Sequence, residues 1–218
     1  MINMVLLLGI LAAGFFFAYV QQFRRYYKTK YKPSLYFGIM CFFFALASVF
    51  AILIGAAVST NNSYLVIPIA HCSTTSGLSA FVFLNLFAVA LTRPGEKMRG
   101  AWISVIPIII LISFEWTSEI FVKGNIGGIP MFTQTSMYKA PYGLPIVEIR
   151  LALMAVMAVY PTYLFLLGAK DTKDRLIGIK SLLMGIGITI ATTGYAIEIT
   201  GAIPYQYMPI AIPMITVG

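Results

Sequence analysis

The chain has 218 residues, of which 60% are hydrophobic and 10% are charged. This composition lies far outside the range of soluble globular domains and indicates an integral membrane protein. The formal net charge is +8, but the basic residues form short clusters between apolar runs, as charges that set membrane topology do. This placement argues against a nucleic-acid partner.

The longest uncharged segment predicts two membrane crossings. From Pro33 to Thr92 the chain runs for 60 residues without Asp, Glu, Lys or Arg. A single helix of that length would reach roughly 90 Å, whereas the hydrocarbon core of a bilayer is about 30 Å thick. The segment therefore has to cross and return, and its polar centre, residues 59–63, is the expected turn.

Apolar runs in chain order predict an all-α polytopic bundle of about seven transmembrane helices, forming a single domain over residues 1–218. The expected spans are 2–22, 34–58, 64–91, 101–122, 146–169, 177–200 and 204–218. The last span would rise only about 22 Å as a helix, and Pro209 and Pro213 would interrupt its hydrogen bonds. We therefore expect a short or kinked seventh helix, or a chain that has been cut at Gly218.

The distribution of Lys and Arg predicts an orientation with the amino terminus outside and the carboxyl terminus inside. In that orientation twelve basic residues lie inside: Arg24, Arg25, Lys28, Lys30, Lys32, Arg93, Lys97, Arg99, Lys170, Lys173, Arg175 and Lys180. Three lie outside: Lys123, Lys139 and Arg150. The first helix is followed, not preceded, by basic residues, so we expect it to be retained and not cleaved as a signal peptide.

The long outer connection, at about 122–147, is rich in Gly, Pro, Thr and Tyr. A lid over the outer mouth of the bundle and a mobile hairpin are both compatible with that composition. Cys41 and Cys72 are expected at different depths in the membrane, too far apart for a disulfide, and hence as unpaired thiols.

Ionisable side chains gather in the outer half of the predicted bundle, where insertion into lipid costs each about 2.5–3.5 kcal/mol. Hydroxyl groups recur with the single histidine at four-residue spacing in the third span, which places them on one helix face. The candidate ligand-binding residues are His71, Thr75, Glu115, Glu119, Glu148, Arg150 and Glu198. They predict an outer polar pocket for a cation or a basic ligand. The alternative is that the headgroup region solvates them and that the hydroxyls serve helix packing.

Motifs of the common enzyme classes do not occur. The chain has no G-x-S-x-G, H-E-x-x-H, Walker or C-x-x-C pattern, and one histidine cannot form the usual multi-histidine metal site. We therefore expect no catalytic residues, no resident metal and no cofactor. Lys180 lies too close to the inner boundary for the Schiff base of a retinal protein.

Local features include Ile106-Pro107, Tyr142-Gly143 before the fifth span, and the run from Leu183 and Gly185 to Pro204, Met208 and Pro209. With the predicted topology, these features resemble the amino-terminal seven-helix sensor region of prokaryotic membrane histidine kinases, over nearly the whole chain. The resemblance implies a ligand-sensing input module in a prokaryotic cell membrane, and it implies no particular ligand residues. No kinase, cyclase or coiled-coil output precedes Gly218, so the signal would pass to a protein partner.

Three functions are compatible with these features. The first is a non-enzymatic, receptor-like or sensor-like module with an outer ligand pocket. The second is an accessory subunit of a larger membrane complex, held by small-residue helix faces such as Ala47, Ala51 and Gly55. The third is a small channel or transporter, although the chain shows no inverted repeat. In each case the partners are the lipid bilayer and a protein in the membrane or at the inner face.

Overall fold

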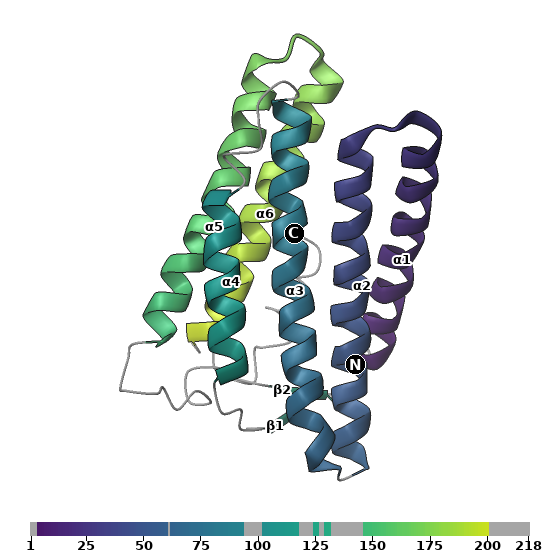
Figure 1. The fold of residues 1–218 in the computed structure, drawn as a ribbon, viewed down its shortest axis with the longest axis vertical. Helices are drawn as coiled ribbons and strands as arrows, with labels where there is room; N and C mark the ends of the chain where they lie inside the picture. Colours follow the sequence, from purple (N-terminus) through teal and green to yellow (C-terminus); the bar gives the residue numbers. More distant parts are fainter. Residues whose placement is uncertain are drawn as a thin grey trace.

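The computed structural model describes residues 4–60, 62–93, 102–117, 124–126, 129–131 and 146–200. These residues form an up-and-down bundle of six helices (Figure 1). The helices are α1 (Met4–Thr29), α2 (Lys32–Ser59), α3 (Ser63–Thr92), α4 (Trp102–Thr117), α5 (Ile146–Asp171) and α6 (Arg175–Thr200). Two strands, β1 (Gly124–Ile126) and β2 (Ile129–Met131), pair antiparallel beside the lower parts of α2 and α3.

The first six predicted spans are confirmed as helices, and the expected seventh span at 204–218 lies outside the described residues. The predicted end of the first helix was wrong, because α1 continues past residue 22 to Thr29 and carries Arg24, Arg25 and Lys28. Charged residues mark where a helix emerges from the hydrocarbon core, but they do not end the helix. A basic residue in the last turn stabilises the helix through its interaction with the helix dipole. The outer connection is described only at β1 and β2, so neither the lid nor the mobile hairpin is tested.

Three of the described helical segments are long and apolar enough to cross a membrane: Val5–Thr29, Lys32–Ala57 and Tyr64–Thr92. Large apolar side chains also face outward from the bundle, among them Ile10 and Phe17 of α1, which are more than 60% exposed. An apolar exterior of this kind suits lipid as the surrounding solvent. The described part of the chain is therefore that of a helical membrane protein.

The core lies where α2, α3, α5 and α6 meet. Its buried side chains include Cys41 of α2, Leu84 and Phe87 of α3, Phe165 of α5 and Ile188 of α6. A smaller cluster of Leu78, Ile108, Leu111 and Met157 joins α4 to α3 and α5. α1 packs on α2 through aromatic rings, with 5.4 Å between the ring centroids of Phe15 and Phe44.

Small residues let neighbouring helices approach closely, as the small-residue faces predict. A Cβ atom on Gly185 of α6 would lie 3.5 Å from Leu166 Cδ2 and 3.6 Å from Phe165 Cβ of α5. Between α2 and α3, the Ser73 hydroxyl donates a 3.1 Å hydrogen bond to the carbonyl of Ala47. Both predicted thiols are unpaired, with Cys41 buried and Cys72 partly buried.

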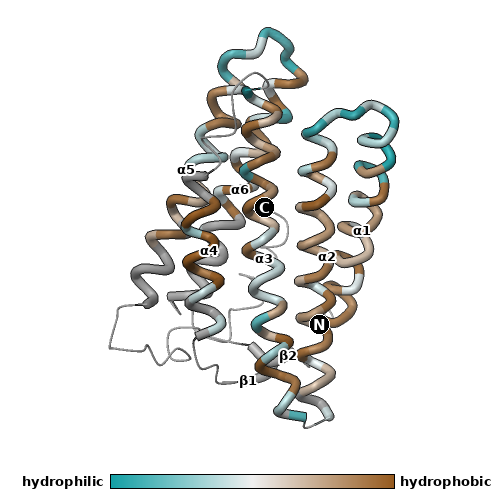
Figure 2. Tube along the Cα trace, in the orientation of Figure 1, coloured by the Kyte–Doolittle hydropathy of each residue, from teal (hydrophilic) through white to brown (hydrophobic). Residues whose placement is uncertain are grey.

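One end of the bundle is basic. The carboxyl ends of α1, α3 and α5 and the amino ends of α2 and α6 meet there, and Figure 2 shows that hydrophilic residues gather at this end. The basic residues described at it are Arg24, Arg25, Lys28, Lys30, Lys32, Arg93, Lys170, Lys173, Arg175 and Lys180. The predicted inner charges that the structure describes thus share one end, which we call the basic end.

Candidate functional site

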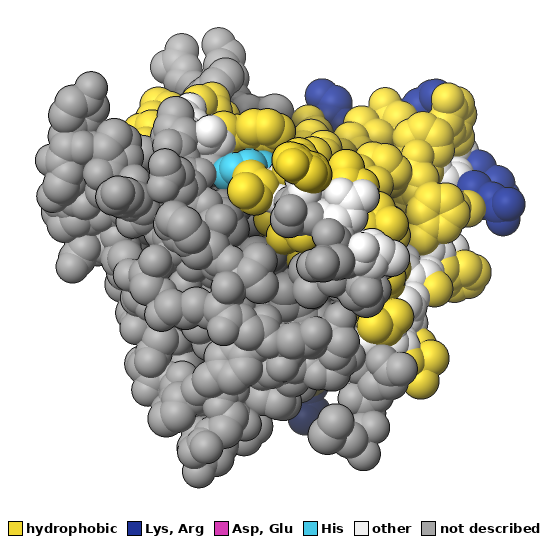
Figure 3. Space-filling view, turned by 90° about the horizontal axis from the view of Figure 1, so that it is seen from below, with side chains coloured by type: hydrophobic (Ala, Val, Ile, Leu, Met, Phe, Trp, Pro, Cys, Tyr) yellow, Lys and Arg dark blue, Asp and Glu magenta, His cyan; other side chains and the backbone are white. Residues whose placement is uncertain are grey.

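At the end opposite to the basic end, a polar cluster joins α3 to α4. His71 is buried on α3 and stacks on the Trp116 ring of α4, with 5.1 Å between ring centroids and 20° between ring planes. The indole Nε1 of Trp116 donates a 2.9 Å hydrogen bond to the hydroxyl of Thr75, one turn after His71. Viewed from this end, the single histidine is visible between apolar side chains and residues that are not described (Figure 3).

The Nδ1 atom of His71 is buried and has no hydrogen-bond partner among the described residues. A polar nitrogen removed from water without a partner destabilises the fold by about 1–3 kcal/mol. Most other polar groups of α3 do have partners. The Ser76 hydroxyl donates to the Cys72 carbonyl at 2.8 Å, for example, as helix packing predicts. Within the described α3, His71 is thus the residue with a buried side-chain atom that has no hydrogen-bond partner among the described residues.

Four other predicted site residues, Glu115, Glu148, Arg150 and Glu198, are described by their backbone alone, at the same end of the bundle. The backbone of Glu115 is in the last turn of α4, next to Trp116. Glu148 and Arg150 are in the first turns of α5, and Glu198 is in the last turn of α6. Glu119 lies outside the described residues. The structure thus brings His71 and Thr75 together with Trp116, and a single site that includes the carboxylates stays a prediction.

Sequence reasoning did not include Trp116 among the candidate residues, although a tryptophan near the membrane boundary suits an interfacial aromatic belt. The indole is half exposed, as a belt residue is, but it also contacts both predicted polar residues of α3. This contact forms because α3 packs against α4. The spacing of residues along a single helix could not predict it.

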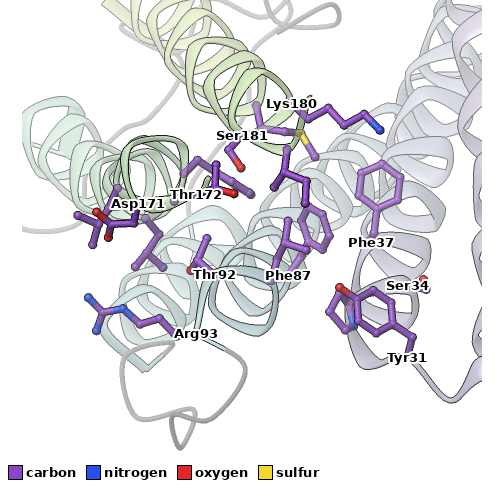
Figure 4. A pocket seen from close by; sticks show the side chains of 18 of the residues that line it. Tyr31, Ser34, Phe37, Phe87, Thr92, Arg93, Asp171, Thr172, Lys180 and Ser181 are labelled. Carbon is purple, nitrogen blue, oxygen red and sulfur yellow. The ribbon is translucent and has the colours of Figure 1, made fainter. Parts of the chain in front are cut away.

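A second site, also missed, lies at the basic end. A cavity of about 1000 Å³ opens between α1, α2, α3, α5 and α6 (Figure 4). Its apolar lining is aromatic and aliphatic and includes Phe37, Phe87 and Phe165. Its polar lining contains the basic residues Arg25, Arg93 and Lys180, the acidic residue Asp171 and the hydroxyl residues Ser34, Thr92, Thr172 and Ser181.

Close packing of three helices forms one wall of this cavity. A Cβ atom on Gly168 of α5 would lie 3.3 Å from Thr92 Cγ2 of α3 and 3.9 Å from Ser181 Oγ of α6. Asp174 fixes the start of α6, because its carboxylate accepts hydrogen bonds from the backbone N–H groups of Leu176 at 2.8 Å and Ile177 at 3.3 Å. These two hydrogen bonds cap α6, the helix that carries Ser181 and Lys180.

The fold and the two sites define the class of the chain as a helical membrane protein with a polar cluster at one end and a basic cavity at the other. A comparison with protein-family models, curated proteins and solved structures finds no match for the chain. The comparisons therefore name no family, and the function has to be inferred from the sites themselves.

Proposed function

We propose that the chain is a seven-helix membrane module of receptor or sensor type, with its amino terminus outside and its carboxyl terminus inside. It binds a ligand at the outer end and passes the signal to a protein partner at the inner face of a prokaryotic cell membrane. The gathering of basic residues at one end supports the orientation, because an excess of Lys and Arg marks the cytoplasmic side.

The observation that carries the proposal is the buried Nδ1 of His71 beside Trp116, which has no hydrogen-bond partner among the described residues. In the proposed mechanism a cationic or basic ligand binds the carboxylates predicted around Glu115, while the imidazole hydrogen-bonds to it. Because Trp116 links α3 to α4 through Thr75, a ligand that contacts His71 would change the packing of these two helices.

The proposal predicts ligand effects on the fluorescence of Trp116. Trp102→Phe leaves Trp116 as the single tryptophan, and its emission can be followed in vesicles while short diamines or Zn²⁺ are added outside. We expect a saturable change that weakens at least tenfold in His71→Gln and in Glu115→Gln. Equal responses in these variants and in the unsubstituted background would contradict the proposal.

The second candidate is an accessory subunit of a larger membrane complex. The side of α1 that faces away from the bundle favours it. Gly9 and Gly14 both have open space where a Cβ would stand, and small residues in lipid admit a close partner helix. Purification in a gentle detergent separates the two candidates. A partner present in stoichiometric amount supports the subunit, whereas a clean monomer that responds to ligand supports the sensor.

A further inference from the structure

The cavity at the basic end combines an apolar interior with a charged mouth. Its volume of about 1000 Å³ lies at the upper end of the range for small-molecule sites, about 300–1000 Å³. It lies between helices that the composition places in lipid, at the level where the chain leaves the membrane. A ligand for this site has to satisfy both regions at once.

The apolar wall is continuous across three helices. The ring centroids of Phe37 on α2 and Phe87 on α3 are 5.1 Å apart, and those of Phe87 and Phe165 on α5 are 5.9 Å apart. Phe165 and Leu164 have no exposed surface, so they support this wall from within the protein. The apolar lining side chains that a ligand can reach include Phe37, Leu91 and Met184. A hydrocarbon chain lying along them would exchange contact with lipid for contact with these side chains.

The mouth is predominantly basic. Three cationic side chains line the cavity, Arg25 from α1, Arg93 after α3 and Lys180 from α6, against one carboxylate, Asp171. Lys180 forms no ion pair with any residue in the described part of the chain, and Figure 4 shows it extending from α6 toward the side where Phe37 lies. The hydroxyl groups of Ser34 and Ser181 are buried at the same site.

We propose that this cavity binds an anionic phospholipid of the surrounding leaflet. The phosphate binds to the basic mouth, and an acyl chain lies along Phe37, Leu91 and Met184. Basic pockets between helices on the cytoplasmic side attract anionic headgroups, and an ammonium or guanidinium group forms charge-assisted hydrogen bonds to phosphate oxygens. The proposal depends on the membrane class of the chain and not on the proposed sensor function.

The test uses the full chain, purified free of lipid in a neutral detergent. Thermal unfolding is followed while dioctanoyl phosphatidylglycerol, dioctanoyl phosphatidylcholine or inorganic phosphate is added. We expect the phosphatidylglycerol to raise the unfolding midpoint saturably by about 5 °C, and the other two compounds to leave it within about 1 °C.

Charge variants locate the binding. Lys180→Gln and Arg25→Gln should each weaken the apparent affinity for phosphatidylglycerol about tenfold. Lys173→Gln is the matched control, because Lys173 is exposed in the α5–α6 turn and does not line the cavity. Both test residues are also exposed, so the variants should fold, and their midpoints without lipid verify this.

Four results would overturn the proposal. They are no response to phosphatidylglycerol, an equal response to phosphatidylcholine, the full effect from inorganic phosphate alone, and an equal loss in Lys173→Gln and Lys180→Gln. The full effect from inorganic phosphate would indicate a free-phosphate site. An equal loss in the two lysine variants would indicate a general attraction of the basic surface for anions.

Discussion

Asn85 is the polar side chain on which the contact between α3 and α5 depends most directly. It has no exposed surface, and its Nδ2 donates to the Phe81 carbonyl on its own helix at 2.9 Å and to the Met157 carbonyl on α5 at 3.4 Å. Water is absent at this depth of a bilayer, so the amide relies on protein partners.

We expect Asn85→Ala to lower the free energy of unfolding by about 1–2 kcal/mol, since it removes an interhelical hydrogen bond and leaves a small void. Unfolding in mild detergent, followed by circular dichroism, measures the change. The control is Thr193→Ala, because the exposed Thr193 hydroxyl donates to the Thr189 carbonyl of its own helix and to no other helix of the described part. Equal midpoints for the two variants would show that the Asn85 bond contributes little.

Thr75 offers a sharper probe of the polar cluster, because its methyl and hydroxyl groups can be tested separately. Thr75→Val keeps the shape but removes the acceptor for the Trp116 indole, whereas Thr75→Ser keeps the hydroxyl. We expect Thr75→Val to destabilise the protein by about 0.5–1.5 kcal/mol and to shift the Trp116 emission, and Thr75→Ser to preserve the emission. Identical spectra for both variants would mean that the hydrogen bond does not form in solution.

At this scale the sequence predicted which residues share a helix face but not their partners. The four-residue spacing of His71 and Thr75 placed them together, and the structure shows both in contact with Trp116. The spacing could not name Trp116, because 41 residues separate it from Thr75 and only helix pairing brings them together.

Among the elements, α5 and α6 illustrate how the space at one glycine limits the side chain that a helix pair can accept. A methyl group on Gly185 would make ordinary contact with Leu166 and Phe165 at 3.5–3.6 Å, so there is room for one carbon and little more. Glycine also costs a helix about 0.5–1 kcal/mol relative to alanine.

Gly185→Ala should therefore be neutral or stabilising by up to about 1 kcal/mol, and Gly185→Leu should destabilise by about 1–3 kcal/mol through overpacking. Thermal unfolding of the two variants measures both values. Gly14→Leu is the control, because Gly14 has open space around it and the larger side chain meets lipid. If Gly185→Leu is as stable as Gly14→Leu, α5 and α6 do not pack as described.

Apolar runs predicted the six described helices because lipid demands long uninterrupted hydrophobic segments. The end of α1 was predicted too early, because basic residues mark the boundary of the membrane and not the end of the helix. The structure ends α1 at Thr29, and the next residue, Lys30, has a φ of 53°, the left-handed conformation that follows many helices. The basic-end cavity was missed because five helices contribute to it and no single one carries its pattern.

For the molecule as a whole, the separation of the basic end from the polar cluster makes the orientation in the membrane testable. In a background of Cys41→Ala and Cys72→Ala, Lys28→Cys reports on the basic end and Asn62→Cys on the opposite end. Both positions are exposed. A membrane-impermeant maleimide added to intact cells should label Asn62→Cys, and it should label Lys28→Cys only after permeabilisation. The reverse pattern would overturn the proposed topology and move the polar cluster to the cytoplasm.

The packing of α1 against α2 also bears on how the chain is assembled during synthesis. Only Lys30 and Tyr31 separate the two helices, and rings such as Tyr19 and Phe42, 5.3 Å apart, supply the contact. A newly made hairpin of this kind can pair within the translocation machinery before the later helices leave the ribosome. The α1–α2 hairpin can then provide the surface against which α3 packs, and the later helices pack after it.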